Sequence, residues 1–269
     1  RVDLPYMEQL TGKTQDELVK DLHGVIFKVP NSEPVSYAAA DEYLSGNVRT
    51  KLIIAQAAAK DDPELAVNVE ALKQVIPKDL SAAEISVRLG TTWIPQEDIQ
   101  QFVMELLTPS QYARGKIKVR YTEFNGDWFI EDKSSDFDNV KANSTYGTKR
   151  ASAYRIIEDT LNLRDVRIFD YVYDEHGNKK AVFNAKETTA AQAKQEAIKQ
   201  AFADWIWKDP ERRNRLVRYY NDTFNCIRPR EYDGSHITFG GISPEITLRP
   251  HQVNAIAHIL YGGNTLLAH

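Results

Sequence analysis

The spacing of the apolar residues changes twice along the chain, and these changes constrain the fold more than any other feature. Up to residue 110 apolar residues recur mainly at helical spacing, as in Val48, Leu52 and Ala55. From Ile117 apolar and charged residues alternate, which predicts a half-buried strand. Helical spacing returns after residue 185. The pattern therefore predicts a helix-rich α+β fold.

We expect four segments along the 269 residues. Residues 1–110 are predicted to be mostly helical, and residues 111–185 to form an α+β module with hairpins. Residues 186–226 are predicted to be a pair of helices. Residues 227–269 are rich in proline and glycine and are predicted to be a linker, followed by a helix and a buried strand over 265–268.

The N-terminal residues 5–30 are predicted to form a small helix-turn-helix unit of winged-helix type. Thr14 precedes an apolar helix and Glu17 follows three residues later, which is the pattern of a capping box. A short strand, Val25–Phe27, comes next. Such units often bind DNA, but others only pack. Because residues 1–110 hold 17 acidic against 10 basic side chains, the charge favours packing.

Other local patterns predict the elements that follow. Ser45 is expected to cap the helix that contains Val48, and residues 87–94 are expected to be extended. In the α+β module one hairpin is predicted at Asn125-Gly126 and a second around His176-Gly177-Asn178, with a helix over 152–163 between them.

A search for reactive groups leaves no complete active site. Gly12-Lys13-Thr14 resembles the end of a phosphate-binding loop, but Met7 stands where the first glycine belongs. The six histidines and the single cysteine, Cys226, show no metal-binding spacing. We therefore predict no catalytic residue and no metal ligand. One cysteine fits a reducing compartment such as the cytoplasm, and no apolar run is long enough to cross a membrane.

Basic residues gather in the second part of the chain. Residues 111–269 hold 24 basic against 21 acidic side chains, although the net charge of the whole chain is −4. Such clusters can neutralise DNA phosphates, or they can simply form a solvated face. The predicted DNA-binding residues are Arg114, Lys116, Lys118, Arg120, Lys149, Arg150, Arg155, Arg212, Arg213, Arg215 and Arg218.

The C-terminal residues carry a resemblance to a known motor. The stretch 244–252, an apolar helix and the stretch 262–269 resemble the segment that leads into a superfamily-two helicase motor of Swi/Snf type. The resemblance implies that Gln252 reads the adenine edge of ATP, because a carboxamide both donates and accepts hydrogen bonds. Arg249 and His251 flank Gln252 in this adenine-reading motif.

Several further blocks resemble one family, the very large bacterial helicase–adenine-methylase proteins of conjugative elements and phages, which are similar to Dar-type antirestriction proteins. The blocks are Asp41–Arg49, Trp93–Pro95, Asn143–Thr148, Ile157–Leu163, Trp207–Arg213 and Ile227–His236.

This resemblance implies a non-catalytic segment between a methylase and a motor. The sequence ends at His269, before the expected phosphate loop, and the methylase tetrapeptide is absent. We therefore expect DNA and the flanking domains as partners, in the bacterial cytoplasm and without a membrane. ATP, Mg²⁺ and S-adenosylmethionine are implied only for the parent protein. A purely structural or protein-interaction domain without DNA contact is the alternative.

Overall fold

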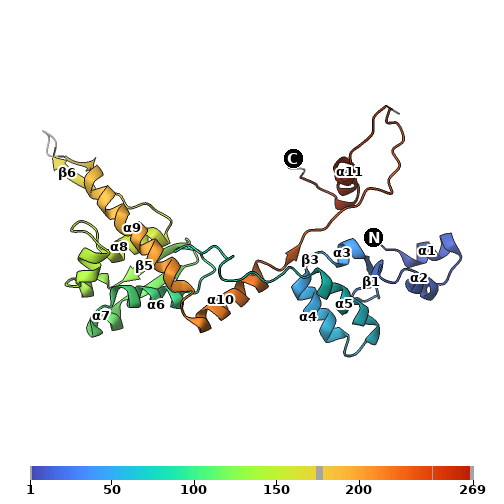
Figure 1. Ribbon diagram of the computed structural model, residues 1–269, viewed down its shortest axis with the longest axis horizontal. Coiled ribbons are helices and arrows are strands. Elements are labelled where there is room, and N and C mark those ends of the chain that lie inside the picture. The colour runs from blue at the N-terminus through green and yellow to red at the C-terminus, as the bar shows by residue number, and fades with distance from the viewer. Residues whose placement is uncertain (1, 174–177, 244, 267–269) are drawn as a thin grey trace. The chain divides into compact units, whose positions relative to one another are not determined.

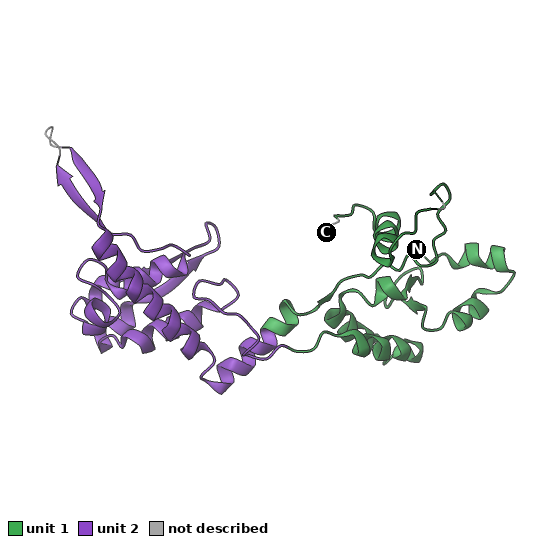
Figure 2. Ribbon diagram, turned by 45° about the horizontal axis from the view of Figure 1, so that its top comes forward, with its two compact units in different colours: residues 1–79, 220–269 green, residues 80–219 purple. Residues whose placement is uncertain are grey.

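A computed structural model of the chain describes residues 2–173, 178–243 and 245–266. The chain divides into two compact units: unit 1 holds residues 1–79 with 220–269, and unit 2 holds residues 80–219 (Figure 2). The predicted helix-rich α+β class is confirmed, and each sheet among the described residues has two strands. The division into four consecutive segments that we expect from the sequence stays a prediction.

Unit 1 begins with two short helices and a hairpin. Helices α1 (Leu4–Thr11) and α2 (Gln15–Asp21) precede the antiparallel strands β1 (Ile26–Lys28) and β2 (Tyr37–Ala39) (Figure 1). The capping box predicted at Thr14 is present, because its side chain accepts from the Glu17 amide and the Glu17 carboxylate accepts from the Thr14 amide. Two helices followed by a hairpin confirm the predicted winged-helix-like N-terminus.

Unit 1 has a small hydrophobic core of its own, built from β1, β2, α3, α4 and α5. In this core the Phe27 and Tyr43 rings stack with their centroids 5.2 Å apart, next to the fully buried Leu72. The remaining elements of unit 1 are α3 (Ala40–Tyr43), β3 (Gly46–Asn47), α4 (Val48–Ala58), the 3-10 helix η1 (Pro63–Leu65), α5 (Ala66–Val75), β8 (Ile227–Arg228) and α11 (Pro250–Gly262).

The pairing of β3 with β8 joins the two sequence segments of unit 1, residues 1–79 and 220–269. Gly46 pairs with Arg228 and Asn47 with Ile227. The Arg49 guanidinium strengthens this junction, since its Nε donates to the Asn225 carbonyl over 3.0 Å.

Three local expectations for the chain were wrong. Ser45 does not cap α4: Gly46 turns with φ 73°, Ser45 donates to the Glu42 carbonyl, and the Asn47 side chain accepts the Thr50 amide instead. Residues 87–94 form turns rather than a strand. Thr265 and Leu266 are not in a strand, and residues 267–269 lie outside the described residues.

A close backbone contact explains the turns at residues 87–94. Gly90 has φ 102°, and a Cβ there would lie 2.6 Å from the Leu161 carbonyl oxygen. Only glycine combines this backbone conformation with such a close approach, so the segment bends over the end of α8 instead of continuing as a strand.

Unit 2 alternates helices with two separate hairpins. The predicted hairpins are confirmed, although the turn residues 174–177 of the second lie outside the described residues. The elements are α6 (Gln96–Leu107), α7 (Gln111–Lys116), β4 (Lys118–Thr122), β5 (Asp127–Glu131), η2 (Lys133–Asp136), the π-helix η3 (Lys141–Thr145), α8 (Ala153–Leu161), β6 (Phe169–Tyr173), β7 (Lys179–Phe183), α9 (Ala185–Ile206) and α10 (Pro210–Thr223), which crosses the unit boundary.

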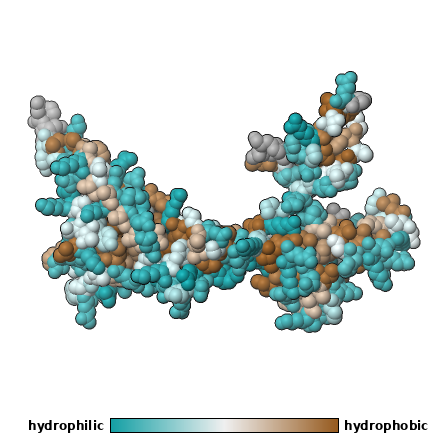
Figure 3. Space-filling model, in the orientation of Figure 1, coloured by the Kyte–Doolittle hydropathy of each residue, from teal (hydrophilic) through white to brown (hydrophobic). Residues whose placement is uncertain are grey.

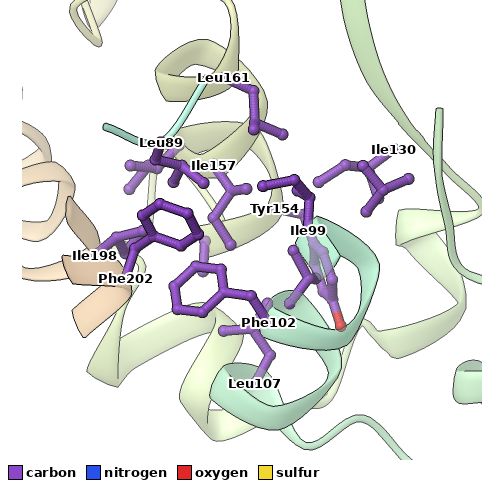
Figure 4. Close-up of a cluster of buried hydrophobic side chains, with 14 of the residues drawn as sticks. Leu89, Ile99, Phe102, Leu107, Ile130, Tyr154, Ile157, Leu161, Ile198 and Phe202 are labelled. Atoms are coloured by element: carbon purple, nitrogen blue, oxygen red, sulfur yellow. The ribbon is translucent and has the colours of Figure 1, made fainter. Parts of the chain in front are cut away.

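The core of unit 2 is built where α6, α8 and α9 meet (Figure 4). The Phe102 ring meets the Phe202 ring edge to face, with centroids 5.0 Å apart, and Trp205 lies against both. Ile157 and Ile198 are fully buried beside them. Large buried aromatics of this kind contribute several kcal/mol each to stability.

Two glutamines of α6 cover the free edge of β4. Gln100 donates to the Ile117 carbonyl and accepts from the Val119 amide, over 3.1 and 2.6 Å. The Gln96 carboxamide accepts from the Tyr121 amide over 3.0 Å. These side chains satisfy backbone groups that a neighbouring strand would otherwise bind.

A buried carboxylate fixes the loop after β5. Asp136 is 2% exposed and accepts from the Tyr154 hydroxyl over 2.7 Å and from the Asn139 side-chain amide over 2.6 Å. Burial and the neighbouring Asp136 raise the pKa of Tyr154, so its phenol stays a hydrogen-bond donor at neutral pH.

We predict that Tyr154→Phe lowers the free energy of unfolding by about 1–3 kcal/mol, because the buried carboxylate loses a donor. Urea unfolding measures the change. The matched control is Tyr173→Phe, whose side chain is 72% exposed and whose stability should stay within about 0.5 kcal/mol of the original. Equal stability of the two variants would contradict the role of this hydrogen bond.

Candidate nucleic-acid interface

The N-terminal unit has the shape of a DNA-binding module but not its usual charge. In helix-turn-helix proteins the second helix enters the major groove. Here that helix is α2, which carries Asp16, Glu17 and Asp21 against the single cation Lys20. Hydrogen bonds from the Thr14 amide and hydroxyl lower the pKa of Glu17, which keeps this carboxylate ionised at neutral pH. An acidic α2 repels the phosphates that flank a groove.

The connection between β1 and β2 is held by its own short hydrogen bonds. The Val29 amide donates to the Ser36 carbonyl over 2.8 Å, and Ser32 links Val29 with Ser36. Lys28, at the end of β1, is 2.7 Å from the Asp62 carboxylate, so its charge is already partnered. The N-terminal helices and hairpin therefore have the shape of a DNA-binding module without its positive charge.

The first predicted basic cluster lies on α7 and β4. Arg114 and Lys116 are exposed in the last turn of α7, where positive charge complements the helix dipole. Lys118 and Arg120 follow at alternate, exposed positions of β4, so they share one face of that strand. Arg120 is 3.2 Å from Glu131 on the neighbouring strand β5.

Two of these four residues have no acidic partner. Among the residues that the structure describes, neither Arg114 nor Lys118 forms an ion pair. The Lys116 ammonium contacts the Tyr112 hydroxyl and lies 4.0 Å from the centre of the Tyr112 ring. This edge of unit 2 therefore keeps positive charge that is available to an anion.

The second predicted cluster surrounds the start of α8. Lys149 is exposed and has no ion pair within the described part of the chain. The Arg150 Nη1 atom is 2.7 Å from Asp170, and its Nη2 donates to the Phe169 carbonyl over 2.9 Å. Arg155 is exposed, donates to the Arg167 carbonyl over 3.3 Å and lies 3.9 Å from Asp159. Arg150 thus ties β6 to the loop before α8.

The third predicted cluster, on α10, is largely used by the fold. Arg212 is 6% exposed, its guanidinium lies 3.5 Å from the Trp205 ring centre, and it donates to the Trp205 and Ile206 carbonyls. It therefore neutralises the last carbonyls of α9, as a cation at a helix C-terminus does. Arg215 is 2.7 Å from the buried Asp98. Arg213 and Arg218 are exposed on the same helix.

The segment with the resemblance to a helicase motor begins α11. Gln252 is exposed, and its Oε1 accepts from the Arg249 amide over 2.9 Å. Its carboxamide therefore caps the first turn of the helix. Arg249 and His251 are also exposed. Adenine recognition by Gln252, Arg249 and His251 stays a prediction.

The other titratable groups do not gather into a metal centre. Within residues 2–173, 178–243 and 245–266, no three His, Cys, Asp or Glu side chains lie close enough together to hold a metal ion. Cys226 is buried, and its Sγ contacts the Thr223 carbonyl over 3.2 Å. His258 stacks on Tyr232 with centroids 4.3 Å apart.

No helix in the described part of the chain is long and apolar enough to cross a membrane.

Sequence reasoning missed one surface, the face of the hairpin β6–β7 that carries Phe169, Tyr171 and Tyr173. These side chains are between 38% and 72% exposed. The sequence signal was available, because three aromatic residues alternate along one strand. The sequence pattern assigns these residues to a hairpin without predicting which of its faces is exposed, and the structure leaves part of each ring open to solvent.

Comparison with models of protein families gives two matches. The family described as "Domain of unknown function (DUF8437)" matches residues 88–226. The family described as "Probable helicase, winged helix domain" matches residues 1–37, which contain α1, α2 and β1. Comparison with the curated proteins and with the solved structures gives no match.

The burial of Arg212 predicts a structural effect. Arg212→Met should lower the free energy of unfolding by about 2–4 kcal/mol, because two helix-end carbonyls lose a charged donor. Arg213→Met, at the exposed neighbouring position, should change it by less than about 0.5 kcal/mol. Thermal and urea unfolding measure both variants, and similar losses would show that Arg212 does not stabilise the end of α9.

The Arg150–Asp170 pair predicts a titration at low pH. Hydrogen bonds from Arg150 and Asn184 lower the pKa of Asp170. A carboxylate with a lowered pKa stabilises the folded state above its ordinary value of about 3.9, and this stabilisation is lost as the pH falls below that value.

The Asn184 side-chain amide, 2.7 Å from Asp170, reports this protonation in an NMR titration. We expect a midpoint below about pH 3.9 and its disappearance in Asp170→Asn. A midpoint at or above the ordinary value would contradict the pairing.

Proposed function

The chain belongs to the family described as a domain of unknown function (DUF8437), and we propose that it is a non-catalytic, DNA-guiding segment of a DNA helicase or translocase. The observation that carries this proposal is the agreement between the match of residues 1–37 to a probable helicase winged helix domain and the helix-turn-helix and hairpin built from these residues. Winged helices and helix-turn-helix units commonly place proteins on duplex DNA.

We place the phosphate contacts of the proposed function on unit 2. The acidic α2 makes direct entry into a groove unfavourable, whereas Arg114, Lys118 and Lys149 are exposed and lack acidic partners in the described chain. Contacts of this kind fix a protein on DNA without reading its sequence. Lys116 and Arg213 belong to the same proposed set, while Arg212 does not, because it is buried.

The finer parts of the proposal rest on the resemblance to helicase–adenine-methylase proteins. In such a parent, the segment connects a methylase that uses S-adenosylmethionine to a motor that uses ATP and Mg²⁺. Gln252, with Arg249 and His251 beside it, then reads the adenine of ATP. The exposed Gln252 side chain is compatible with this role, since it can leave the helix cap to meet a base.

A specific observation favours the second candidate function, a structural or protein-interaction domain without DNA contact. Arg120, Arg150 and Arg215 each lie within 3.2 Å of a carboxylate, which is the arrangement expected when arginines serve the fold. Exposed apolar side chains, such as Ile53 and Ile259, point to the same alternative.

A binding titration separates the two functions. We predict that the 269-residue chain binds a labelled 30-base-pair duplex at low salt, with an affinity that falls linearly in log[salt]. Neutralising Arg114, Lys118 and Lys149 to glutamine should weaken binding at least about tenfold and reduce the salt slope by about 2–3.

The matched control removes three charges from exposed lysines of unit 1, at Lys60, Lys73 and Lys78. This variant has the same net charge as the test variant but should keep most of the affinity. A chain that binds neither duplex nor single-stranded DNA at low salt contradicts the proposed function and leaves the protein-interaction alternative. Equal weakening in both variants would mean that only net charge matters.

A further inference from the structure

The hairpin β6–β7 projects from unit 2 and has little packed against it (Figure 1, Figure 2). Its register pairs Phe169 with Phe183, Tyr171 with Ala181 and Tyr173 with Lys179. Directly paired residues share one face of a two-stranded sheet, and alternate residues of a strand do the same. The three β6 aromatics, Phe183 and Lys179 therefore form one face, which we call the ring face.

The ring face is rich in exposed aromatic surface. Tyr171 is 59% exposed, Tyr173 is 72% exposed and Phe183 is 53% exposed. The space-filling view shows hydrophobic residues beside hydrophilic ones on this hairpin (Figure 3). Exposed apolar strips of this kind mark interaction surfaces, and an isolated two-stranded hairpin is only marginally stable in water.

The base of the hairpin is held firmly, although its strands are exposed. Arg150 binds Asp170 and the Phe169 carbonyl, and Asn184 binds Asp170 from the other side over 2.7 Å. The Asn184 amide also donates to the Ile168 carbonyl over 2.9 Å. Asp170 lies on the face opposite the rings, and Arg150 balances its charge. The ring face is therefore presented in a fixed direction.

The mixture of rings and cations indicates the chemistry of the occupant. The Lys179 ammonium lies 4.0 Å from the centre of the Tyr171 ring, and Lys180 is exposed on the opposite face. Aromatic side chains interleaved with lysines are typical of surfaces that bind single-stranded nucleic acid. An apolar protein partner would have to bury the Lys179 ammonium, which costs free energy without a paired charge.

The spacing of the rings fits an unpaired strand. Alternate residues of a β-strand are about 6.8 Å apart. Successive bases of a stacked strand are about 3.4 Å apart, so a ring inserted between two bases separates them by about twice that distance. In a duplex the base faces are already occupied by neighbouring pairs, whereas a single strand can open to admit the rings.

We propose that the ring face binds single-stranded nucleic acid by stacking bases on Phe169, Tyr171 and Tyr173, with Lys179 moving to the phosphates. This inference rests on the proposed function, because it names the form of nucleic acid that unit 2 recognises. It adds a contact that depends on base faces rather than on charge alone.

The test uses the 269-residue chain and the double substitution Tyr171→Ala with Tyr173→Ala. Both side chains are exposed, so the unfolding curve should not change. Fluorescence anisotropy with labelled dT30 should show at least about a tenfold loss of affinity, while affinity for the duplex changes less than about twofold. Phe124→Ala is the matched control, since this ring is 98% exposed on the turn of the other hairpin. It should bind like the original chain.

Crosslinking gives a direct readout of the contact. A dT30 strand with 5-iododeoxyuridine should crosslink to Tyr171 or Tyr173, and mass spectrometry identifies the residue. A parallel U30 titration shows whether the strand is DNA or RNA.

The outcomes separate this inference from the proposed function. If the chain binds dT30 and the variant with Tyr171→Ala and Tyr173→Ala binds it equally well, the inference about the ring face is overturned and the proposed function stands. If dT30 binding depends on the rings but not on Arg114, Lys118 and Lys149, the ring face is supported and the basic edge is overturned. If the chain binds no nucleic acid, both are overturned. If the ring substitutions abolish self-association instead, the occupant is a second copy of the chain, and the inference is also overturned.

Discussion

Buried hydrogen bonds from side chains of α9 fix the position of residues 164–168 along this helix. Apolar packing alone would not fix that position, because it is not directional. Gln195 is 2% exposed, and its carboxamide donates to the Thr160 hydroxyl and the Arg164 carbonyl and accepts from the Val166 amide. Thr188, also buried, bonds with the Ile168 backbone. Buried polar groups demand fixed partners, so these contacts set the path of residues 164–168 along the helix.

That path decides where the exposed hairpin begins. Residues 164–168 lead directly into β6, and Asn184 begins α9 immediately after β7. The start of β6 and the end of β7 are therefore both attached to backbone that α9 and its N-cap hold in place. The apolar contacts of Phe202 and Ile198 with α6 and α8 hold α9 itself in place. The direction of the ring face thus follows from the core of unit 2 rather than from contacts along the strands.

Local sequence patterns predicted the elements well, because their causes are local. The Thr14 capping box, the hairpin turn at Asn125-Gly126 and the helix of Phe102 depend on residues a few positions apart. The failures involve contacts between distant residues. Gly90 turns because the Leu161 carbonyl approaches it, and Arg212 is buried because α9 ends beside it. Neither contact is visible in composition or spacing, so a set of arginines that looks uniform in sequence contains members with different roles.

Because of the glutamines on α6, the two hairpins of unit 2 differ in how open their edges are to pairing with another strand. Gln96 and Gln100 occupy the outward amides and carbonyl beside β4, so an incoming backbone finds no open ladder along that strand. On the hairpin β6–β7 the comparable side-chain contact lies at the base, where Arg150 donates to the Phe169 carbonyl over 2.9 Å. If unit 2 recruits another polypeptide by strand addition, geometry directs it to this hairpin, and the remainder of the unit stays resistant to edge-to-edge aggregation.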